Sequence, residues 1–252
     1  MSRPGLSEGS LHEQLTDSNK STIQRYQDLA LGTSSIWYLI KFELVILTTS
    51  WVPGALGLLL RKIFYPRVLG SVGRNVVFGQ GVAIRHGLKI TIGDNVIVDD
   101  NVLLDAKGES NTGINIGSDT ILSRSVVIAC KNGDITIGNK CSLGIGTIIH
   151  STEGCNVDLG DEVLTGAYCY FVGGGAYRTD DLKKSFKSQG PDPKGGIVVE
   201  NNVWFGANIQ VLDGVNIGTS SIIGASSVLN RDVAAFDIVA GVPAKLIRSR
   251  KE

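Results

Sequence analysis

The chain has 252 residues, of which 24 are basic and 24 are acidic, so its formal net charge at pH 7 is zero. A balanced charge gives no support for a nucleic-acid partner, which needs a basic surface. Glycine is frequent, at 32 residues, and aromatic residues make up only 6% of the chain. This composition argues against a helical bundle and favours a fold of tight corners and small inward side chains.

Residues 1–34 are predicted to form a polar arm. The stretch SLHEQLTDSNKSTIQRYQDL can be helical, and we expect a mobile arm or a short surface helix rather than a catalytic site. His12 lies in this arm and is not expected to act in catalysis. The first 30 residues lack the apolar core of a signal peptide, so we expect a cytoplasmic protein.

Residues 35–72 are predicted to be an apolar, helical and membrane-associated segment. Phe42–Leu60 carries one charge, Glu43, and is interrupted at Pro53–Gly54. A membrane span needs about 20 predominantly apolar residues, so this stretch is marginal in length and broken near its middle. Three interpretations stay open: an in-plane or re-entrant membrane anchor, which we favour, an apolar helix pair packed on protein, and a true span.

Two groups of residues flank this segment as they would at a membrane surface. The aromatic residues that can anchor it in the interface are Trp37, Tyr38, Trp51 and Tyr65. The basic residues that can meet anionic headgroups are Arg61, Lys62, Arg67 and Arg74. We therefore expect the protein at the cytoplasmic face of a membrane.

Residues 73–234 are dominated by a repeat of six residues. This period fits neither a helix nor a flat half-buried strand, so it indicates a repeat architecture. Three repeats close one triangular coil of about 18 residues, and stacked coils bury one aliphatic column. The prediction is an all-β solenoid. The inward positions are Ile92, Val98, Leu104, Ile116, Leu122, Ile128, Ile137, Leu143, Ile149, Leu159, Thr165, Phe171, Val199, Phe205, Val211, Ile217, Ile223 and Leu229.

The spacing between successive coils shows where residues leave the solenoid. The longest excess follows the coil that starts at Leu159 and places a loop at residues 173–196, which is rich in glycine, proline and charge. Long ordered loops in compact domains are usually functional. Residues 72–89 are interpreted as an irregular first coil, and residues 235–252 as a cap.

The four cysteines, Cys130, Cys141, Cys155 and Cys169, lie in or beside repeat positions and form no C-x-x-C pair. We interpret them as buried thiols in a reducing compartment rather than as metal ligands or disulfides.

The end of the repeat, residues 197–248, reads IVVENNVWFGANIQVLDGVNIGTSSIIGASSVLNRDVAAFDIVAGVPAKLIR. It resembles the hexapeptide-repeat acyltransferases, in particular sugar O-acetyltransferases related to maltose and galactoside acetyltransferases, and the resemblance covers roughly residues 76–248. It implies a left-handed parallel β-helix, a homotrimer with sites between subunits, and acetyl-CoA as co-substrate. The implied reaction is acetyl transfer to a hydroxyl of a sugar, either lipid-linked or part of a polysaccharide. N-acetylation of an amino sugar stays an open variant.

Acetyl transfer from a thioester to a hydroxyl needs a base, and a neutral histidine is the usual one at neutral pH. Equivalent positions of four coils are Asp105, Ala129, His150 and Val172, and each directly follows an inward residue, so all four face outward. His150 therefore lies beside the strand from which the long loop departs. It is the predicted general base, and the alternative is a solvated strand histidine or a subunit contact.

The resemblance also exposes a departure from the family, which often carries a histidine at the start of this loop. Tyr177 stands there instead, so either His150 supplies the base or the protein is a catalytically degenerate scaffold or binding protein. The other residues predicted around the loop are Glu153 and Asp180 as catalytic partners that orient the imidazole, and Tyr177, Arg178 and Asp181 as acceptor contacts.

Acetyl-CoA is implied by the resemblance to lie in a groove between subunits, over the later coils. The residues this implicates are Trp204, Gly206, Ala207, Gly224 and Ala225, with Lys245 and Arg248 near the CoA phosphates. Repeat geometry alone also explains the glycines and alanines. A β-helical metal hydrase would need three converging histidines, and His12, His86 and His150 are too dispersed in the sequence, so no metal is expected; His86 is interpreted as a surface or edge residue.

Overall fold

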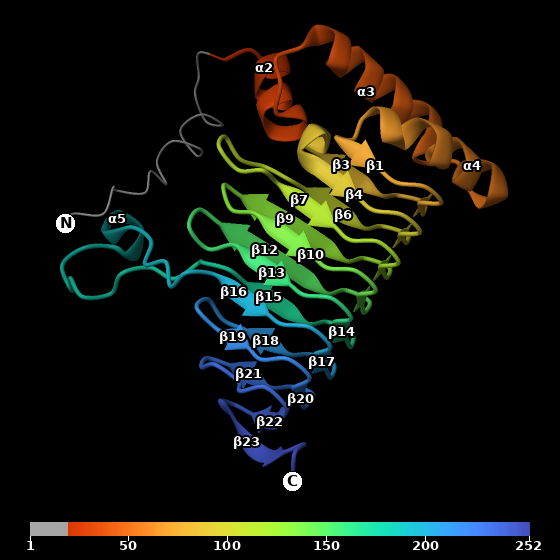
Figure 1. The fold of residues 1–252 in the computed structure, drawn as a ribbon. Helices are drawn as coiled ribbons and strands as arrows, with labels where there is room; N and C mark the ends of the chain where they lie inside the picture. Colours follow the sequence, from red (N-terminus) through yellow and green to blue (C-terminus); the bar gives the residue numbers. More distant parts are fainter. Residues whose placement is uncertain (1–19) are drawn as a thin grey trace.

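The structure is a computed structural model and describes residues 20–252. His12 and most of the predicted arm lie outside the described residues. The chain forms a parallel β-solenoid with three faces, with helices against its first coils and a hairpin at its C-terminal end (Figure 1). Each coil contributes one short strand to each face, which is the all-β solenoid that the repeat of six predicts.

The three sheets contain seven, nine and seven strands. Sheet A consists of β1 (Ser71–Val72), β4 (Ile90–Ile92), β7 (Ile114–Ile116), β10 (Ile135–Ile137), β13 (Val157–Leu159), β16 (Ile197–Val199) and β19 (Asn216–Ile217). Sheet B consists of β2 (Val77–Phe78), β5 (Ile97–Val98), β8 (Ile121–Leu122), β11 (Ser142–Leu143), β14 (Leu164–Thr165), β17 (Trp204–Phe205), β20 (Ile222–Ile223), β22 (Asp237–Gly241) and β23 (Ala244–Ser249). Sheet C consists of β3 (Ala83–Arg85), β6 (Leu103–Asp105), β9 (Val127–Lys131), β12 (Ile148–Thr152), β15 (Tyr170–Val172), β18 (Gln210–Val211) and β21 (Val228–Leu229).

The core is the column of repeat positions that the sequence predicts to point inward. Every one of them is buried, and the most exposed, Thr165, is only 8% exposed. The rings of Phe171 and Phe205, from adjacent coils, pack edge-on with centroids 5.1 Å apart. Because each coil stacks in register on the next, the hydrophobic column is continuous along the solenoid.

The corners between strands use residues in the left-handed conformation. Asn75, Asn95 and Asp119 occupy one corner of successive coils with φ of 57°, 57° and 59°. Asparagine and aspartate tolerate this conformation better than most residues because their short polar side chains hydrogen-bond locally. Here they bond from coil to coil: Asn75 Nδ2 donates to Asn95 Oδ1 at 3.2 Å, and Asn95 Nδ2 donates to Asp119 Oδ1 at 2.9 Å.

The first coil is regular, which corrects the sequence interpretation of residues 72–89. Its strands β1, β2 and β3 place Val72, Phe78 and Ile84 six residues apart, and Phe78 and Ile84 are buried. The same period of six was present in the sequence, where glycines and polar residues separate these positions.

His86, directly after β3, is buried rather than on the surface, which also corrects the sequence interpretation. Its side chain is 5% exposed, its Nε2 lies 3.1 Å from the backbone oxygen of Asp28, and its backbone N–H donates to the Ala30 oxygen at 2.8 Å. The N-terminal helices cover this position, so His86 joins them to the first coil.

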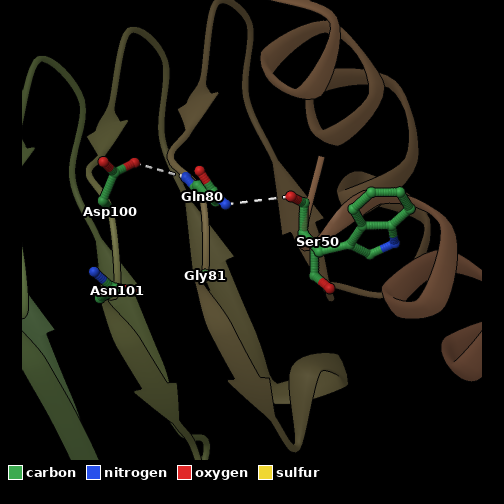
Figure 2. Close-up of a pocket in the computed structure, with 6 residues that line it drawn as sticks. Ser50, Gln80, Gly81, Asp100 and Asn101 are labelled. Carbon is green, nitrogen blue, oxygen red and sulfur yellow. Dashed lines mark hydrogen bonds between the residues drawn. The ribbon is translucent and has the colours of Figure 1, made fainter. Parts of the chain in front are cut away.

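The helices precede the solenoid, except for two short ones. The helices before the solenoid are α2 (Thr22–Tyr26), the π-helical turn η1 (Gln27–Leu31), α3 (Ile36–Thr49), α4 (Gly54–Phe64) and the 3₁₀ turn η2 (Tyr65–Arg67). The two short ones within it are the 3₁₀ turn η3 (Gly87–Lys89) and α5 (Phe186–Gln189) in the long loop. Residues 50–53 separate α3 from α4, next to the predicted Pro53–Gly54 break. Ser50 and Trp51, which follow α3, line a polar pocket together with Gln80, Gly81, Asp100 and Asn101. In this pocket Gln80 Nε2 donates to the Trp51 oxygen at 3.2 Å (Figure 2).

Four of the residues expected to meet a membrane are instead engaged with protein. Arg61 is only 1% exposed and donates to three backbone oxygens, those of Thr49 at 3.0 Å, Val52 at 2.8 Å and Phe78 at 2.9 Å. The Thr49 carbonyl ends α3 and has no partner within the helix, so Arg61 satisfies it. The other three are Tyr38 and Tyr65, which are 7% and 0% exposed, and Arg74, which pairs with Asp94 at 2.9 Å.

No single helix in residues 20–252 has the length and apolar character needed to cross a membrane. The segments Thr22–Leu31 and Ile36–Thr49, bent by 69° to one another, reach that threshold only as a pair, by length and composition.

Residues 235–252 contain the hairpin of β22 and β23. β22 pairs in parallel with β20 and so extends sheet B, and β23 turns back antiparallel to β22. The hairpin therefore covers the last coil of the sheet.

Candidate active site

His150 lies on the outer face of sheet C, in β12. Ile149 points into the core, and alternation along the strand turns His150 outward, where it is half-buried. Its register neighbours are Ala129 on β9 and Val172 on β15, as the spacing of the coils predicts. The long loop begins at the residue after Val172, so the imidazole sits one strand from the start of the loop.

The surroundings of His150 favour a neutral imidazole at neutral pH. Burial lowers its pKa below the ordinary value of 6.5, the positive charge of Lys131 lowers it further, and the carboxylate of Asp105 raises it. Within the described part of the chain, the ring makes no hydrogen bond. A neutral imidazole whose ring nitrogens are not engaged can accept a proton from a substrate.

Asp105 is a carboxylate near His150 whose role the sequence reasoning missed. It lies in the same outward column, two strands away, and the small side chain of Ala129 stands between them. Asp105 is 9% exposed and pairs with Arg85 at 3.5 Å. The signal was available, because the count that placed His150 on this face also placed Asp105 there.

Neither of the two carboxylates predicted to orient His150 is hydrogen-bonded to its ring within residues 20–252. Glu153 is half-buried in the turn that follows β12, and Asp180 is exposed in the long loop. The charges that act on the pKa of His150 belong to Lys131 and Asp105. The structure therefore offers Asp105, rather than Glu153 or Asp180 of the same chain, as the electrostatic partner.

The long loop, residues 173–196, is a structured arm that projects from the solenoid, with α5 near its outer end (Figure 1). At its base, Arg178 N–H donates to the Gly190 oxygen at 3.0 Å and Asp192 N–H donates to the Ala176 oxygen at 2.8 Å. Tyr177 forms an antiparallel bridge with Pro191 between these bonds. The predicted acceptor contacts Tyr177 and Arg178 are thus at the base of the arm, on its two-stranded part.

Asp181 has a role in folding the arm. Its carboxylate accepts a hydrogen bond from Lys183 N–H at 3.0 Å and pairs with Lys184 at 3.4 Å, and its backbone N–H donates to the side chain of Gln189 at 3.0 Å. Asp181 is therefore engaged within the arm, whereas Tyr177 and Arg178 have exposed side chains.

Both ends of the arm are fixed to the solenoid. At the start, Gly173 N–H donates to the His150 oxygen at 2.7 Å, and a Cβ on Gly174, whose φ is 90°, would lie 1.8 Å from Thr152 Oγ1. At the end, the Asp213 carboxylate accepts from the backbone N–H groups of Lys194 and Gly196, both at 2.7 Å. These contacts attach the arm beside the strand that carries His150.

Replacing Asp213 with alanine is expected to release the end of the arm. Two backbone donors and the Cys155 thiol, which donates to Asp213 at 3.2 Å, would lose their acceptor. Leaving a buried donor without an acceptor destabilises the folded state by about 1–3 kcal/mol. Limited proteolysis with mass spectrometry should show faster cleavage within residues 173–196. The control is Asp158→Ala, because the Asp158 carboxylate makes no hydrogen bond in residues 20–252; equal cleavage of the two variants would contradict this role.

The residues predicted to bind acetyl-CoA lie along the C-terminal part of sheet B and its corner. Trp204 is 56% exposed and shares an outward column with Ile222, Ile238 and Arg248 on the following strands. Lys245 pairs in register with Ala240, next to the corner of Gly224. The described ion pairs include neither Lys245 nor Arg248, and both side chains are exposed, so both cations are available to phosphate groups.

The glycines of this corner also have a packing reason, as repeat geometry predicts. A Cβ on Gly206 would lie 2.7 Å from the backbone nitrogen of Ala225, and one on Gly224 would lie 2.7 Å from the Cβ of Ala240. Ala207 and Ala225 are exposed at the same corner. Close stacking of coils explains the glycines, and the two alanines leave a smooth exposed edge beside Trp204.

The cysteines and the histidines give no sign of a metal centre in the described residues. All four cysteines are free and buried, which confirms their interpretation as buried thiols, and burial raises the pKa of Cys130 to about 12. Residues 20–252 contain no group of three or more histidine, cysteine or carboxylate side chains arranged to hold a metal ion.

The solenoid is similar to those of solved acyltransferase structures. The polysialic-acid-specific acetyltransferase NeuO matches with a TM-score of 0.52 and 22% identity, over 71% of this chain and 82% of its own. AntD, an N-acyltransferase from Bacillus cereus in complex with dTDP and 3-hydroxybutyryl-CoA, matches with a TM-score of 0.53 and 19% identity, over 81% of this chain and 91% of its own. These likenesses establish the fold as a left-handed β-helix of hexapeptide repeats.

Relatives in sequence carry the same type of name. A protein of Staphylococcus aureus (strain COL) named as an acetyltransferase is 33% identical over 111 residues, which make up 38% of this chain and 56% of the relative. A Mycobacterium tuberculosis protein named likewise is 27% identical over 138 residues, or 55% of this chain and 45% of the relative. No family model matches the chain, and it spans about half the length of these curated relatives.

The chain is thus similar in sequence to proteins named as acetyltransferases, and its fold is that of hexapeptide-repeat acyltransferases of known structure. In this hexapeptide-repeat protein, the candidate base and the candidate CoA residues lie on different faces. His150 is on sheet C, whereas Trp204 and Arg248 are on sheet B. A single chain therefore presents two separate parts of a candidate site.

The surface next to His150 is apolar and exposed. Ile148 and Tyr170, 39% and 37% exposed, are register neighbours in the adjacent outward column of sheet C. Ile145 and Tyr168, 49% and 66% exposed, stand at the corner before these strands. Together these four residues form an uncovered apolar surface beside the imidazole.

Proposed function

We propose that this protein is an acetyl-CoA-dependent acetyltransferase that transfers the acetyl group to a hydroxyl of a sugar, with His150 as general base. The observation that carries the proposal is the imidazole of His150, which is kept neutral and whose ring nitrogens are unengaged, one strand from the base of a fixed arm. The names of the sequence relatives and the 3-hydroxybutyryl-CoA bound in the similar AntD structure support this reaction class.

In the proposed reaction, a ring nitrogen of His150 accepts the proton of the acceptor hydroxyl while its oxygen attacks the thioester carbonyl. The tetrahedral intermediate then expels the CoA thiolate, which takes the proton from the imidazolium. The negative charge of Asp105 favours the imidazolium that forms between these two steps. The acetyl ester and free CoA are the products, and no other reactant is required.

We propose that the complete site forms between subunits of a homotrimer. Leu182 and Phe186 on the arm are 96% and 65% exposed, and the apolar surface beside His150 is uncovered in the single chain. If the arm of a neighbouring copy lies over this surface, the arm residues and the apolar surface beside His150 are buried together. Sheet B of one copy would then bring its CoA residues to sheet C of the next. Exposed apolar area of this kind marks interaction surfaces.

Acetyl-CoA titration and mixed trimers test this proposal. Calorimetry should give saturable acetyl-CoA binding by both the unmodified protein and His150→Ala, with CoA release lost only in the variant. Trimers mixed from His150→Ala and Trp204→Ala chains should regain part of the activity that each lacks alone, since some sites then combine two intact residues. If the mixed trimers regain no activity, the site is not shared between subunits. A monomer in light scattering would also exclude a site between subunits.

The second candidate is a catalytically degenerate scaffold, favoured by Tyr177 at the position where the family often has histidine. Absence of acetyl-CoA binding at millimolar concentration would support the scaffold over the transferase. The acceptor class is tested by offering sugar hydroxyls and amino sugars side by side, since the similar AntD structure is of an N-acyltransferase. The apolar N-terminal helices motivate the finer form of the proposal, in which the acceptor is lipid-linked and the reaction takes place at the cytoplasmic face of a membrane.

The pH dependence of the rate should report the charges around His150. The base is active when neutral, so the rate should fall as pH falls through a pKa below 6.5. Asp105→Asn removes a charge that favours the imidazolium, so the acid limb of kcat/KM should move to lower pH. Lys131→Gln removes a charge that opposes it, so the limb should move to higher pH. The control, Lys140→Gln, should leave the limb in place, and equal shifts in all three variants would exclude His150 as the titrating group.

A further inference from the structure

Helix α3 is apolar on two nearly opposite faces. Tyr38, Phe42, Val45 and Thr49 form the buried face, each at most 7% exposed, which packs toward the solenoid and α4. The residues of the other face are spaced three and four apart and are exposed by 45–82%. They are Trp37, Ile40, Leu44, Leu47 and Trp51, the last just beyond the helix end. A helix that is apolar all round is expected in a protein interior or a membrane.

Helix α4 adds to this uncovered surface. Its exposed large side chains are Leu56, Leu58, Leu59 and Ile63, between 41% and 62% exposed. We call the exposed apolar residues of the two helices the α3–α4 face. Single exposed leucines are ordinary on protein surfaces, but nine large exposed apolar side chains on two consecutive helices mark an interaction site.

The charges on these helices are strongly asymmetric. Lys41 and Lys62 are exposed, and Arg67 follows α4 with its guanidinium 4.9 Å from the Phe64 ring centroid. The acidic side chain on α3 and α4 is Glu43, and its carboxylate already accepts a hydrogen bond from Tyr26 O–H. The exposed charges of this region are thus three basic side chains against one carboxylate, a net charge of +2, which is complementary to an anionic surface.

We propose that the α3–α4 face docks this protein, in plane, on the anionic surface of a lipid bilayer. Its leucines and isoleucines enter the boundary between headgroups and acyl chains, Lys41, Lys62 and Arg67 meet lipid phosphates, and Trp37 and Trp51 hold the two ends of α3 at the interface. This surface is separate from the candidate active site. The docking does not depend on whether the protein transfers acetyl groups.

Vesicle flotation of the full-length protein tests the docking. The protein should float with vesicles of phosphatidylcholine and phosphatidylglycerol, and more weakly with phosphatidylcholine alone. Leu44→Ser combined with Leu47→Ser should reduce the bound fraction at least tenfold, because two exposed apolar side chains lose their transfer into the interface. The matched control is Leu246→Ser, at a leucine that is 61% exposed on β23, which should float as the unmodified protein does.

Charge variants separate lipid phosphates from apolar adsorption. Lys41→Gln and Lys62→Gln should each weaken partition to the anionic vesicles by about fivefold, as expected for one basic residue near an anionic surface. Lys140→Gln, an exposed lysine of the solenoid, should leave it unchanged. Equal losses on neutral and anionic vesicles would overturn the anionic part of the proposal.

Tryptophan fluorescence tests which surface meets the lipid. The chain has three tryptophans, so Trp204→Phe leaves Trp37 and Trp51 as reporters of the α3–α4 face. Their emission should shift to the blue on vesicle addition and should be quenched by brominated lipid. The proposal is overturned if neither occurs, or if the protein self-associates without vesicles in a way that the two serine substitutions abolish, since a second copy would then occupy the face.

Discussion

Replacement of His150 with alanine is expected to lower kcat by about 10²–10⁴-fold, the usual contribution of a positioned general base. The affinity for acetyl-CoA should stay the same, because the residues assigned to the donor lie on sheet B. Added imidazole should restore part of the rate by entering the space that the side chain vacates. The rate is measured as CoA release under saturating acetyl-CoA.

The matched variant for this experiment is Tyr177→Phe. It removes only the hydroxyl of the residue that stands where the family often has its loop histidine. If His150 is the base, Tyr177→Phe should retain most of the activity. A large loss of activity in Tyr177→Phe, together with unchanged activity in His150→Ala, would assign the role of the base to the arm instead.

Replacement of Arg61 with methionine is expected to lower the free energy of unfolding by about 3–5 kcal/mol, because two buried backbone oxygens and one partly buried oxygen lose a charged donor at once. The two side chains have similar length, so lost packing is a minor part of the effect. Urea unfolding followed by circular dichroism measures the loss. Hydrogen exchange should locate it in α3, α4 and the first coil, since solenoid coils are stabilised mainly by their nearest neighbours.

Arg74→Met is the control for this loss of stability. Arg74 is also an arginine of the N-terminal region, but its side chain is 87% exposed and its partner Asp94 is partly exposed. Its removal should change the unfolding transition little. Equal destabilisation by the two substitutions would contradict a special role for the buried guanidinium.

The solenoid could be predicted from the sequence because its rule is local. An inward residue every six positions specifies the strand, the corner and the stacking partner together, and the same rule repeats along the chain. His150 could be placed on its face for the same reason: counting coils from Leu104 to Phe171 brings Asp105, Ala129, His150 and Val172 into one column. Only the first coil was not recognised as regular, although Val72, Phe78 and Ile84 follow the same period.

The N-terminal segment could not be predicted in this way, because its partners are distant in sequence and follow no period. From composition alone, Tyr38, Tyr65 and Arg61 were predicted to lie at a membrane interface. Packing against the first coil buries all three and leaves Trp37, Leu44 and Leu47 outside. Which apolar face of α3 is covered depends on the position of the solenoid, and hydrophobicity does not distinguish the two faces.

The surroundings of the candidate base were likewise decided by tertiary structure. The sequence by itself determined the fold, the outward direction of His150 and the place where the arm departs, because each of these follows from the six-residue period. The path of the arm, its attachment to Asp213, and Asp105 as the carboxylate that acts on His150 depend on contacts between separate coils. Such contacts arise only when the coils are stacked, since they join side chains that no local pattern relates.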